Sequence, residues 1–165
     1  LYGRKMCSEL YPALYRDETA ARIISQVDYD FSTLEKAAGS VMQRFGFLEL
    51  AMRQNDFAWE VEDYLKTHPT AAVVNLGCGL DDTGRRCDNG TCKIYNIDFP
   101  AVIAARNELL PAGEREQNIP CDLNDRCLRR RGVLCRRCVL LFPYPAGQGA
   151  GAGYGGSLPR WTARL

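Results

Sequence analysis

Apolar residues in the first 66 positions recur with the spacing of amphipathic helices. The segment Leu1–Leu10 predicts a first short helix. Asp17 is placed to cap a second helix, whose apolar face lies between residues 20 and 27. Ser32 or Thr33 could cap a third helix, and Glu35 stands three residues after Ser32, which is the capping-box offset. That helix is expected to continue past Met52 before a further amphipathic segment over residues 57–65, so residues 1–68 form a helical N-terminal region.

The pattern changes to short apolar runs after residue 69. Residues 71–76 and 92–97 are rich in β-branched and other apolar residues and predict two strands. Pro100 is well placed to begin a helix that runs to Leu109, and residues 119–123 predict a third short strand. Strand, helix and strand in succession are typical of an α/β fold with a parallel sheet.

Chemistry-bearing residues follow these strands directly. Gly77 and Gly79 follow the first strand, and Asp98 ends the second. Strand, glycine turn and terminal carboxylate are typical of a nucleotide-type site, although a glycine turn alone is equally typical of a plain tight turn. Asp82 occupies the position of the third glycine of the dinucleotide fingerprint. The spacing therefore favours an adenosyl ligand without a pyrophosphate, such as S-adenosylmethionine, over NAD.

Length and charge narrow the class of protein. The 165 residues suit one domain, and the net charge of +1 hides an asymmetry. Residues 1–125 hold all 20 acidic residues but only 13 of the 21 basic ones, which argues against a nucleic-acid partner for that part. We find no long apolar run and no signal peptide, so we expect no membrane span and a cytoplasmic location. The start at Leu1, without Met, suggests a fragment.

The eight cysteines raise the question of a metal site. Only Cys135 and Cys138 form a CxxC pair, Cys87 and Cys92 are separated by four residues, and His68 is the one histidine. A zinc ribbon needs two CxxC-like pairs, so we expect no metal. Reduced cytoplasmic thiols are the simplest interpretation.

Four segments form a specific combination: VVNLGCGLD at 73–81, YNIDFPAVIAARNELLP at 95–111, CDLND at 121–125 and LYGRKMCSELYPALYRDETA at the N-terminus. Together they resemble the leucine carboxyl methyltransferase family, in particular its bacterial S-adenosylmethionine-dependent O-methyltransferases associated with polyketide tailoring. The resemblance covers about residues 1–125. It implies a helical lid over 1–68, followed over 69–125 by the first half of a Rossmann-like class I methyltransferase sheet with about three parallel strands.

The resemblance also implies roles for individual residues. The turn beneath the methionine part of the cofactor would contain Gly77 and Gly79, and Asp98 would accept the ribose hydroxyls. Asp122, with the backbone of Leu123, would meet the adenine. Arg44, on a lid helix, would pair with the cofactor carboxylate, a contact that arginine makes well.

The expected reaction places few demands on acid–base groups. Methyl transfer to a carboxylate or hydroxyl acceptor is an in-line displacement at a sulfonium, and it needs alignment more than proton transfer. We therefore assign no catalytic base, and Arg53 is the second helical cation of interest near the expected cleft. The acceptor would be a small molecule, and the sequence leaves its identity and the oligomeric state open.

Residues 126–165 differ in character from the rest. They contain eight arginines, no acidic residue and the low-complexity run GQGAGAGYGG. A back-translation of residues 132–144, read one base later, gives AFFAAGVFYYFLT, which resembles the fourth strand of the family. We therefore expect an irregular, out-of-frame tail, which leaves one edge of the first strand unpaired. We also expect the chain to be a poorly folded and inactive methyltransferase fragment. The alternative is a non-enzymatic zinc- or nucleic-acid-binding module that uses this Cys/Arg-rich tail.

Overall fold

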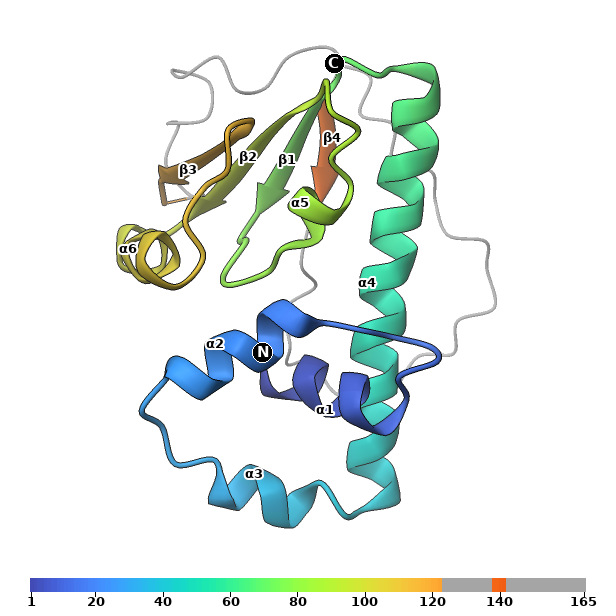
Figure 1. Cartoon of the computed structure of the whole chain (residues 1–165), viewed down its shortest axis with the longest axis vertical. Helices are drawn as coiled ribbons and strands as arrows, with labels where there is room; N and C mark the ends of the chain where they lie inside the picture. The colour runs from blue at the N-terminus through green and yellow to red at the C-terminus, as the bar shows by residue number, and fades with distance from the viewer. Residues whose placement is uncertain (123–137, 142–165) are drawn as a thin grey trace.

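The computed structural model of the chain describes residues 1–122 and 138–141. A parallel sheet occupies one end of the molecule, three short helices occupy the other, and one long helix runs beside both (Figure 1). The helices are α1 (Tyr2–Leu10), α2 (Glu18–Gln26), α3 (Ser32–Ala37), α4 (Val41–Thr67), α5 (Thr83–Arg86) and α6 (Pro100–Leu109). The strands are β1 (Ala72–Leu76), β2 (Lys93–Asp98), β3 (Glu116–Pro120) and β4 (Cys138–Leu141).

The caps of the N-terminal helices follow the sequence only in part. The carboxylate of Asp17 accepts a hydrogen bond of 2.7 Å from the N–H of Ala20 and caps α2, as predicted. The predicted capping box at Ser32 is wrong, because the N-cap of α3 is Phe31 and makes no side-chain cap. Ser40 instead caps α4, which continues without a break through the two segments that the sequence pattern separates. The capping hydroxyl at Ser40 explains why a new helix begins there.

The sheet has the strand order β3-β2-β1-β4, and every pair is parallel. The three predicted strands are confirmed, although the third one begins and ends three residues earlier than expected. The fourth strand corrects a further expectation, because β4 lies within the supposed irregular tail and pairs with β1 from Ala72 and Cys138 onward. The edge of β1 is therefore paired. An apolar run of four residues supplies the strand, and the backbone groups of β1 supply its partners.

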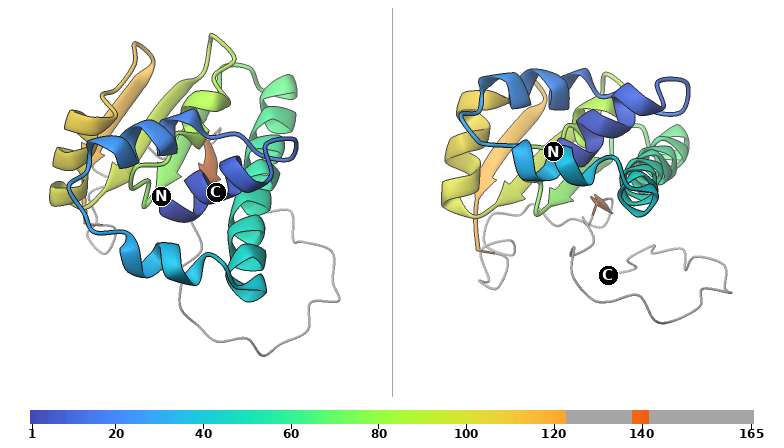
Figure 2. Two further views of the ribbon diagram at one scale, coloured as in Figure 1. Left: turned by 60° about the horizontal axis from the view of Figure 1, so that its bottom comes forward. Right: turned by 90° about the horizontal axis from the view of Figure 1, so that it is seen from below.

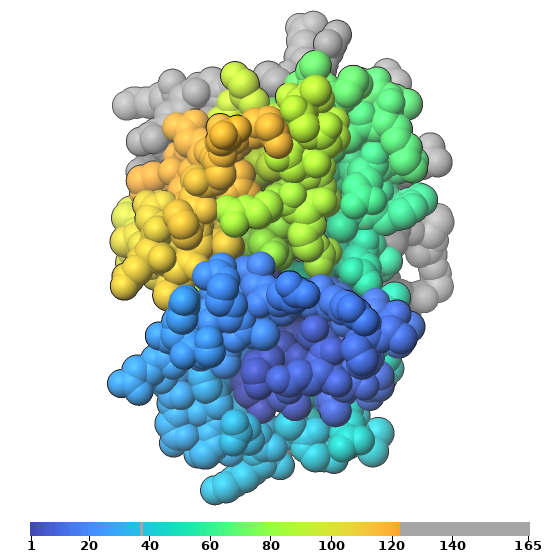
Figure 3. Space-filling view, in the orientation of Figure 1, coloured from blue at the N-terminus to red at the C-terminus, as the bar shows by residue number. Residues whose placement is uncertain are grey.

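The core joins the long helix to one face of the sheet. Ala58, Val61 and Leu65 of α4 pack against Val73 of β1 and Ile94 of β2. Because side chains alternate along a strand, the next residues on this helix-covered face are the asparagines at positions 75, 96 and 118. The strands point toward the three short helices, which lie across their carboxyl ends (Figures 1 and 2). In the space-filling view the N-terminal segments close against the sheet half of the molecule (Figure 3).

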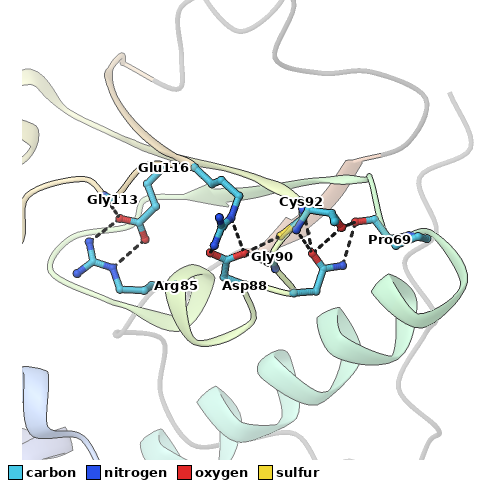
Figure 4. A network of polar contacts seen from close by, with 10 residues as sticks. Pro69, Arg85, Asp88, Gly90, Cys92, Gly113 and Glu116 are labelled. Atoms are coloured by element: carbon cyan, nitrogen blue, oxygen red, sulfur yellow. Dashed lines mark hydrogen bonds and ion pairs between the residues drawn. The ribbon is translucent and has the colours of Figure 1, made fainter.

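A polar network ties the loops around β2 and β3 together (Figure 4). Arg85 donates to both carboxylate oxygens of Glu116, whose side chain is only 4% exposed. Arg115 makes a similar bidentate contact with Asp88. Burial opposes ionisation of Glu116, but the hydrogen bonds from Arg85 and from the N–H of Gly113 outweigh it, and its pKa lies below the usual value. The hydrogen bonds from Arg115 lower the pKa of Asp88 as well.

These lowered pKa values predict acid sensitivity. A folded carboxyl with a depressed pKa stabilises the fold above its unfolded pKa, and this stabilisation is lost as the pH falls through the folded value. We therefore expect the free energy of unfolding to decline once the pH drops below about 5. Glu116→Gln should lower the free energy of unfolding by about 1–2 kcal/mol at pH 7 and make its decline at acidic pH less steep. Urea titrations between pH 7 and pH 3 measure both effects. An equally steep decline in E116Q and the wild type would contradict the assignment. Glu114→Gln, at an exposed position, is the matched control.

Several cysteine side chains lie in the core of the described part of the chain. Cys7, Cys78, Cys87 and Cys92 are free and buried. Cys121 is disulfide-bonded, which corrects the expectation of reduced thiols throughout.

In residues 1–122 and 138–141 no three His, Cys, Asp or Glu side chains gather where they could hold a metal ion. Over the same ranges, no helix has the length and apolar character needed to span a membrane. The first cysteine of the CxxC pair lies outside the described residues.

Burial predicts that two of these thiols are unreactive in the folded protein. It raises the pKa of Cys78 and of Cys87 to about 12, and nearby acidic groups reinforce the effect. Since the thiolate is the nucleophile, alkylation by iodoacetamide at pH 8 should be slow at both sites. Unfolding in urea should make both sites react at the rate of an ordinary thiol. Peptide mass spectrometry at timed quenches distinguishes the cysteines, and equal rates in the native and unfolded chain would contradict this prediction.

Candidate functional site

A glycine turn joins the end of β1 to the end of β2. Gly77 and Gly79 have φ angles of +65° and +49°, a region that favours glycine. The N–H groups of Gly77 and Cys78 both donate to the carbonyl of Ile97, at 2.8 and 3.2 Å. A Cβ built on Gly79 would meet no atom within 4 Å. The space beside the Cα of Gly79 is therefore open, so a ligand can approach the backbone there closely.

Asp98 lies at the last position of β2, beside this turn. Its Oδ2 accepts a hydrogen bond of 2.7 Å from the N–H of Gly79, and its Oδ1 accepts one of 2.7 Å from the N–H of Phe99. The residue is 9% exposed. Each carboxylate oxygen has a second lone pair, so the fixed carboxylate can still accept hydrogen bonds from hydroxyl groups of a ligand. The structure thus brings together Gly77, Gly79 and Asp98, three of the residues that the sequence singled out.

Asp122 follows β3 at the same edge of the sheet. The N–H of Cys121 donates to the backbone carbonyl of Asp98 at 2.8 Å, which ties the end of β3 to the end of β2. The side chain of Asp122 is exposed. Leu123, its predicted companion, lies outside the described residues. Among described positions, the predicted carboxylates of β2 and β3 therefore occupy adjacent strand ends.

The structure does not bring Arg44 to this edge. Arg44 is exposed in the first turn of α4, whereas Gln54 of the same helix donates to Asp81 in the turn after β1, at 2.8 Å. Their separation of ten positions corresponds to about 15 Å along a helix axis. Arg53, the other helical cation of interest, is half-buried and adjacent to Gln54.

Sequence reasoning missed Asp81 as the residue where the N-terminal helices contact the turn. Its Oδ1 accepts hydrogen bonds from Arg4 Nη1 at 2.8 Å, from Gln54 Nε2 at 2.8 Å and from the Thr83 hydroxyl at 2.9 Å. Arg4 also donates to the carbonyl of Leu80 at 2.8 Å. The sequence predicted a helix for the segment that holds Arg4 and assigned no role to Arg4 itself, and a cation on the buried side of such a helix was the available signal.

A second carboxylate holds the other side of the Arg4 guanidinium. Asp17 Oδ2 lies 3.1 Å from Arg4 Nε, as an ion pair rather than an aligned hydrogen bond. The Tyr15 hydroxyl contacts the same oxygen at 2.9 Å and also lies within hydrogen-bonding distance of Gln54 Oε1. Burial, reinforced by the charge of Asp17, raises the pKa of Tyr15. Tyr15 is therefore neutral at pH 7 and joins α4 to the start of α2.

A carboxylate fixed beside a glycine turn can accept hydrogen bonds from a ligand with adjacent hydroxyl groups. A glycine turn and a fixed carboxylate lie at the carboxyl ends of neighbouring parallel strands, where α/β proteins bind nucleotide-like ligands. The residues described at this edge do not include an adjacent nucleophile and base of the kind used in covalent catalysis. The site is suited to orienting a ligand rather than attacking it.

Comparisons with known proteins agree with this geometry. A family model described as leucine carboxyl methyltransferase matches residues 3–131. The tetracenomycin polyketide synthesis O-methyltransferase TcmP of Streptomyces glaucescens is 33% identical over 96 residues. The aligned part is 58% of this chain and 33% of that protein, so the chain covers about a third of the relative's length.

Proposed function

Since the chain belongs to the leucine carboxyl methyltransferase family, we propose that its turn after β1 and the end of β2 bind S-adenosylmethionine for methyl transfer to an oxygen of a small molecule. The observation that carries the proposal is the 2.7 Å hydrogen bond between the N–H of Gly79 and Asp98 Oδ2. It fixes the carboxylate at the strand end where a ribose would be recognised.

The residues present fit this cofactor. Gly79 leaves open space above the turn, and Asp98 keeps free lone pairs for two vicinal hydroxyl groups. We propose that Asp122, which follows the neighbouring strand β3 and is exposed, contacts the adenine. When bound, S-adenosylmethionine supplies a methyl group on a positively charged sulfur. The chain's own residues orient the ligand, and this reaction class demands alignment above all.

We assign the contact with the cofactor's carboxylate to Arg53 rather than Arg44. Arg53 adjoins Gln54, which contacts the turn, whereas Arg44 lies about 15 Å further along the helix axis. Replacing Arg53 with Met should weaken binding of S-adenosylhomocysteine about tenfold or more, because a charge-assisted contact is lost. Arg44→Met is the matched control and should leave the dissociation constant within about threefold. The reverse ranking, measured by isothermal titration calorimetry, would restore Arg44 to the site.

Two measurements on the chain as it exists test the proposed function. Calorimetry with S-adenosylhomocysteine should show saturable one-to-one binding, and NADH should show none. Methyl transfer is measured separately, with methyl-labelled S-adenosylmethionine and small acceptors that carry carboxyl or hydroxyl groups. A chain that unfolds cooperatively yet binds no S-adenosylhomocysteine would contradict the proposal. Binding without turnover would support the cofactor site and the sequence expectation of an inactive fragment.

A further inference from the structure

Arg106 of α6 is a buried cation with an unusual set of partners. It is 1% exposed, and within the described residues all of its hydrogen bonds go to neutral oxygens. Burial lowers its pKa, which reflects the cost of keeping a charge there. A buried charge is costly unless the protein surrounds it with good hydrogen-bond acceptors. The position of these acceptors therefore indicates what Arg106 does.

Two of the acceptors belong to the backbone of the turn after β1. Arg106 Nη1 donates to the carbonyl of Gly79 at 3.0 Å and to the carbonyl of Asp81 at 2.7 Å. The N–H of the same Gly79 donates to Asp98 at 2.7 Å. Gly79 is thus held on both sides, by Arg106 through its carbonyl and by Asp98 through its N–H. The orientation of this one glycine links the buried guanidinium to the carboxylate.

A row of three asparagine side chains, two of them buried and one half-buried, extends from the guanidinium across the sheet. Arg106 Nε donates to Asn118 Oδ1 at 3.1 Å, and Asn96 Nδ2 donates to the same oxygen at 3.1 Å. Asn75, Asn96 and Asn118 are register partners on β1, β2 and β3, on the face covered by helices. Asn75 and Asn96 are 2% and 1% exposed, and each has one polar atom without a partner in the described structure. Such a row is costly in a core, which argues that it serves to hold Arg106 in place.

We propose that Arg106 is a positioning residue of the cofactor site, which sets the Gly79–Asp81 backbone so that Gly79 holds Asp98 in its ribose-binding orientation. This inference rests on the proposed function for its consequence in binding, although its structural part can be tested without a ligand. Asn96 holds the side chain of Asn118, and Asn118 holds the guanidinium of Arg106. The guanidinium in turn holds the carbonyl groups of Gly79 and Asp81, and so the backbone of the turn.

The test compares three variants by two readouts. Arg106→Met removes the donors and keeps most of the side-chain volume, whereas Arg106→Lys keeps a cationic donor for the two carbonyl groups. Arg85→Met is the matched control, because Arg85 also makes three hydrogen bonds but directs them to Glu116 and Pro111, away from the turn. The readouts are the dissociation constant for S-adenosylhomocysteine and the hydrogen-exchange rate of the Gly79 amide, measured by NMR without ligand.

We expect R106M to weaken binding about 10- to 100-fold, as is typical when an outer partner of a binding group is lost. The Gly79 amide should exchange faster in R106M than in R85M at equal overall stability. R106K should recover part of both effects, and R85M should bind within about threefold of wild type. Wild-type binding by R106M, or equal Gly79 protection in R106M and R85M, would overturn the inference. If the wild type itself binds no S-adenosylhomocysteine, the proposed function fails while the exchange comparison still decides the role of Arg106. If R106M does not fold, R106K against R85M makes the same comparison.

Discussion

An Asp98→Asn substitution is expected to weaken binding of S-adenosylhomocysteine at least 30-fold. Both carboxylate oxygens already accept backbone N–H groups, from Gly79 and Phe99. An asparagine has only one acceptor oxygen, so its NH₂ group would face one of these donors and the turn would move. It also loses the charge-assisted hydrogen bonds to ribose hydroxyls, and about 2–4 kcal/mol corresponds to a 30- to 1,000-fold change. Isothermal titration calorimetry at constant salt measures the effect directly.

Asp88→Asn provides the matched control for this substitution. Asp88 is also a carboxylate that accepts a backbone N–H, from Gly90, but it pairs with Arg115 in the network around β2 and β3. Its substitution should lower stability modestly and leave the dissociation constant within about threefold. Wild-type affinity in D98N, in a protein that still unfolds cooperatively, would remove Asp98 from the site. Equal losses in both variants would indicate a general effect of destabilisation.

The sequence was sufficient to place the glycine turn beside Asp98. Both follow apolar runs of strand length, and the carboxyl ends of adjacent parallel strands always meet at one edge of a sheet. Local pattern therefore determined this part of the site. The hydrogen bond from the N–H of Gly79 to Asp98 forms because the two strand ends lie side by side at that edge.

Contacts between distant segments could not be predicted in this way. Arg4 and Asp81 are separated by 77 positions, and nothing in their neighbourhoods marks them as partners. The position of Arg44 within α4 depends on where this helix begins. The sequence pattern alone predicts a start before Ser40, whereas the helix begins at Val41. Because each residue adds about 1.5 Å along the axis, the position of the helix start decides how far Arg44 lies from the turn.

The strand β4 changes the expectation about stability. The sequence predicts an unpaired edge on β1, but Cys138–Leu141 pair with Ala72–Asn75 in parallel register. Short apolar runs can serve as strands wherever a neighbouring edge offers hydrogen bonds, so a tail of unusual composition can still complete a sheet. Whether residues 126–165 are read out of frame stays a prediction, since most of them lie outside the described residues.

Replacing Arg4 with Met is expected to cost about 3–5 kcal/mol of the free energy of unfolding. The guanidinium is 5% exposed and lies between Asp17, whose side chain is 1% exposed, and Asp81. Its loss leaves the carboxylate of Asp17 buried without its cation. Small domains are stable by only about 5–15 kcal/mol, so the effect is large. Urea titration measures the effect. Arg16→Met is the control, because Arg16 is exposed and donates to the carbonyl of Pro12, and the expected change is within about 0.5 kcal/mol.

The double variant Arg4→Met with Asp17→Asn separates a buried unpaired charge from lost packing. The amide side chain introduced at position 17 keeps an oxygen for the N–H of Ala20, so the cap of α2 survives. Without the negative charge, the double variant should be more stable than R4M alone, by about 1–3 kcal/mol. Recovery of this size attributes the cost of R4M to the stranded carboxylate. If the free energy of unfolding of R4M lies within about 1 kcal/mol of the wild-type value, Asp17 is hydrated in solution. The contact between Gln54 and Asp81 would then be sufficient to hold the N-terminal helices to the turn.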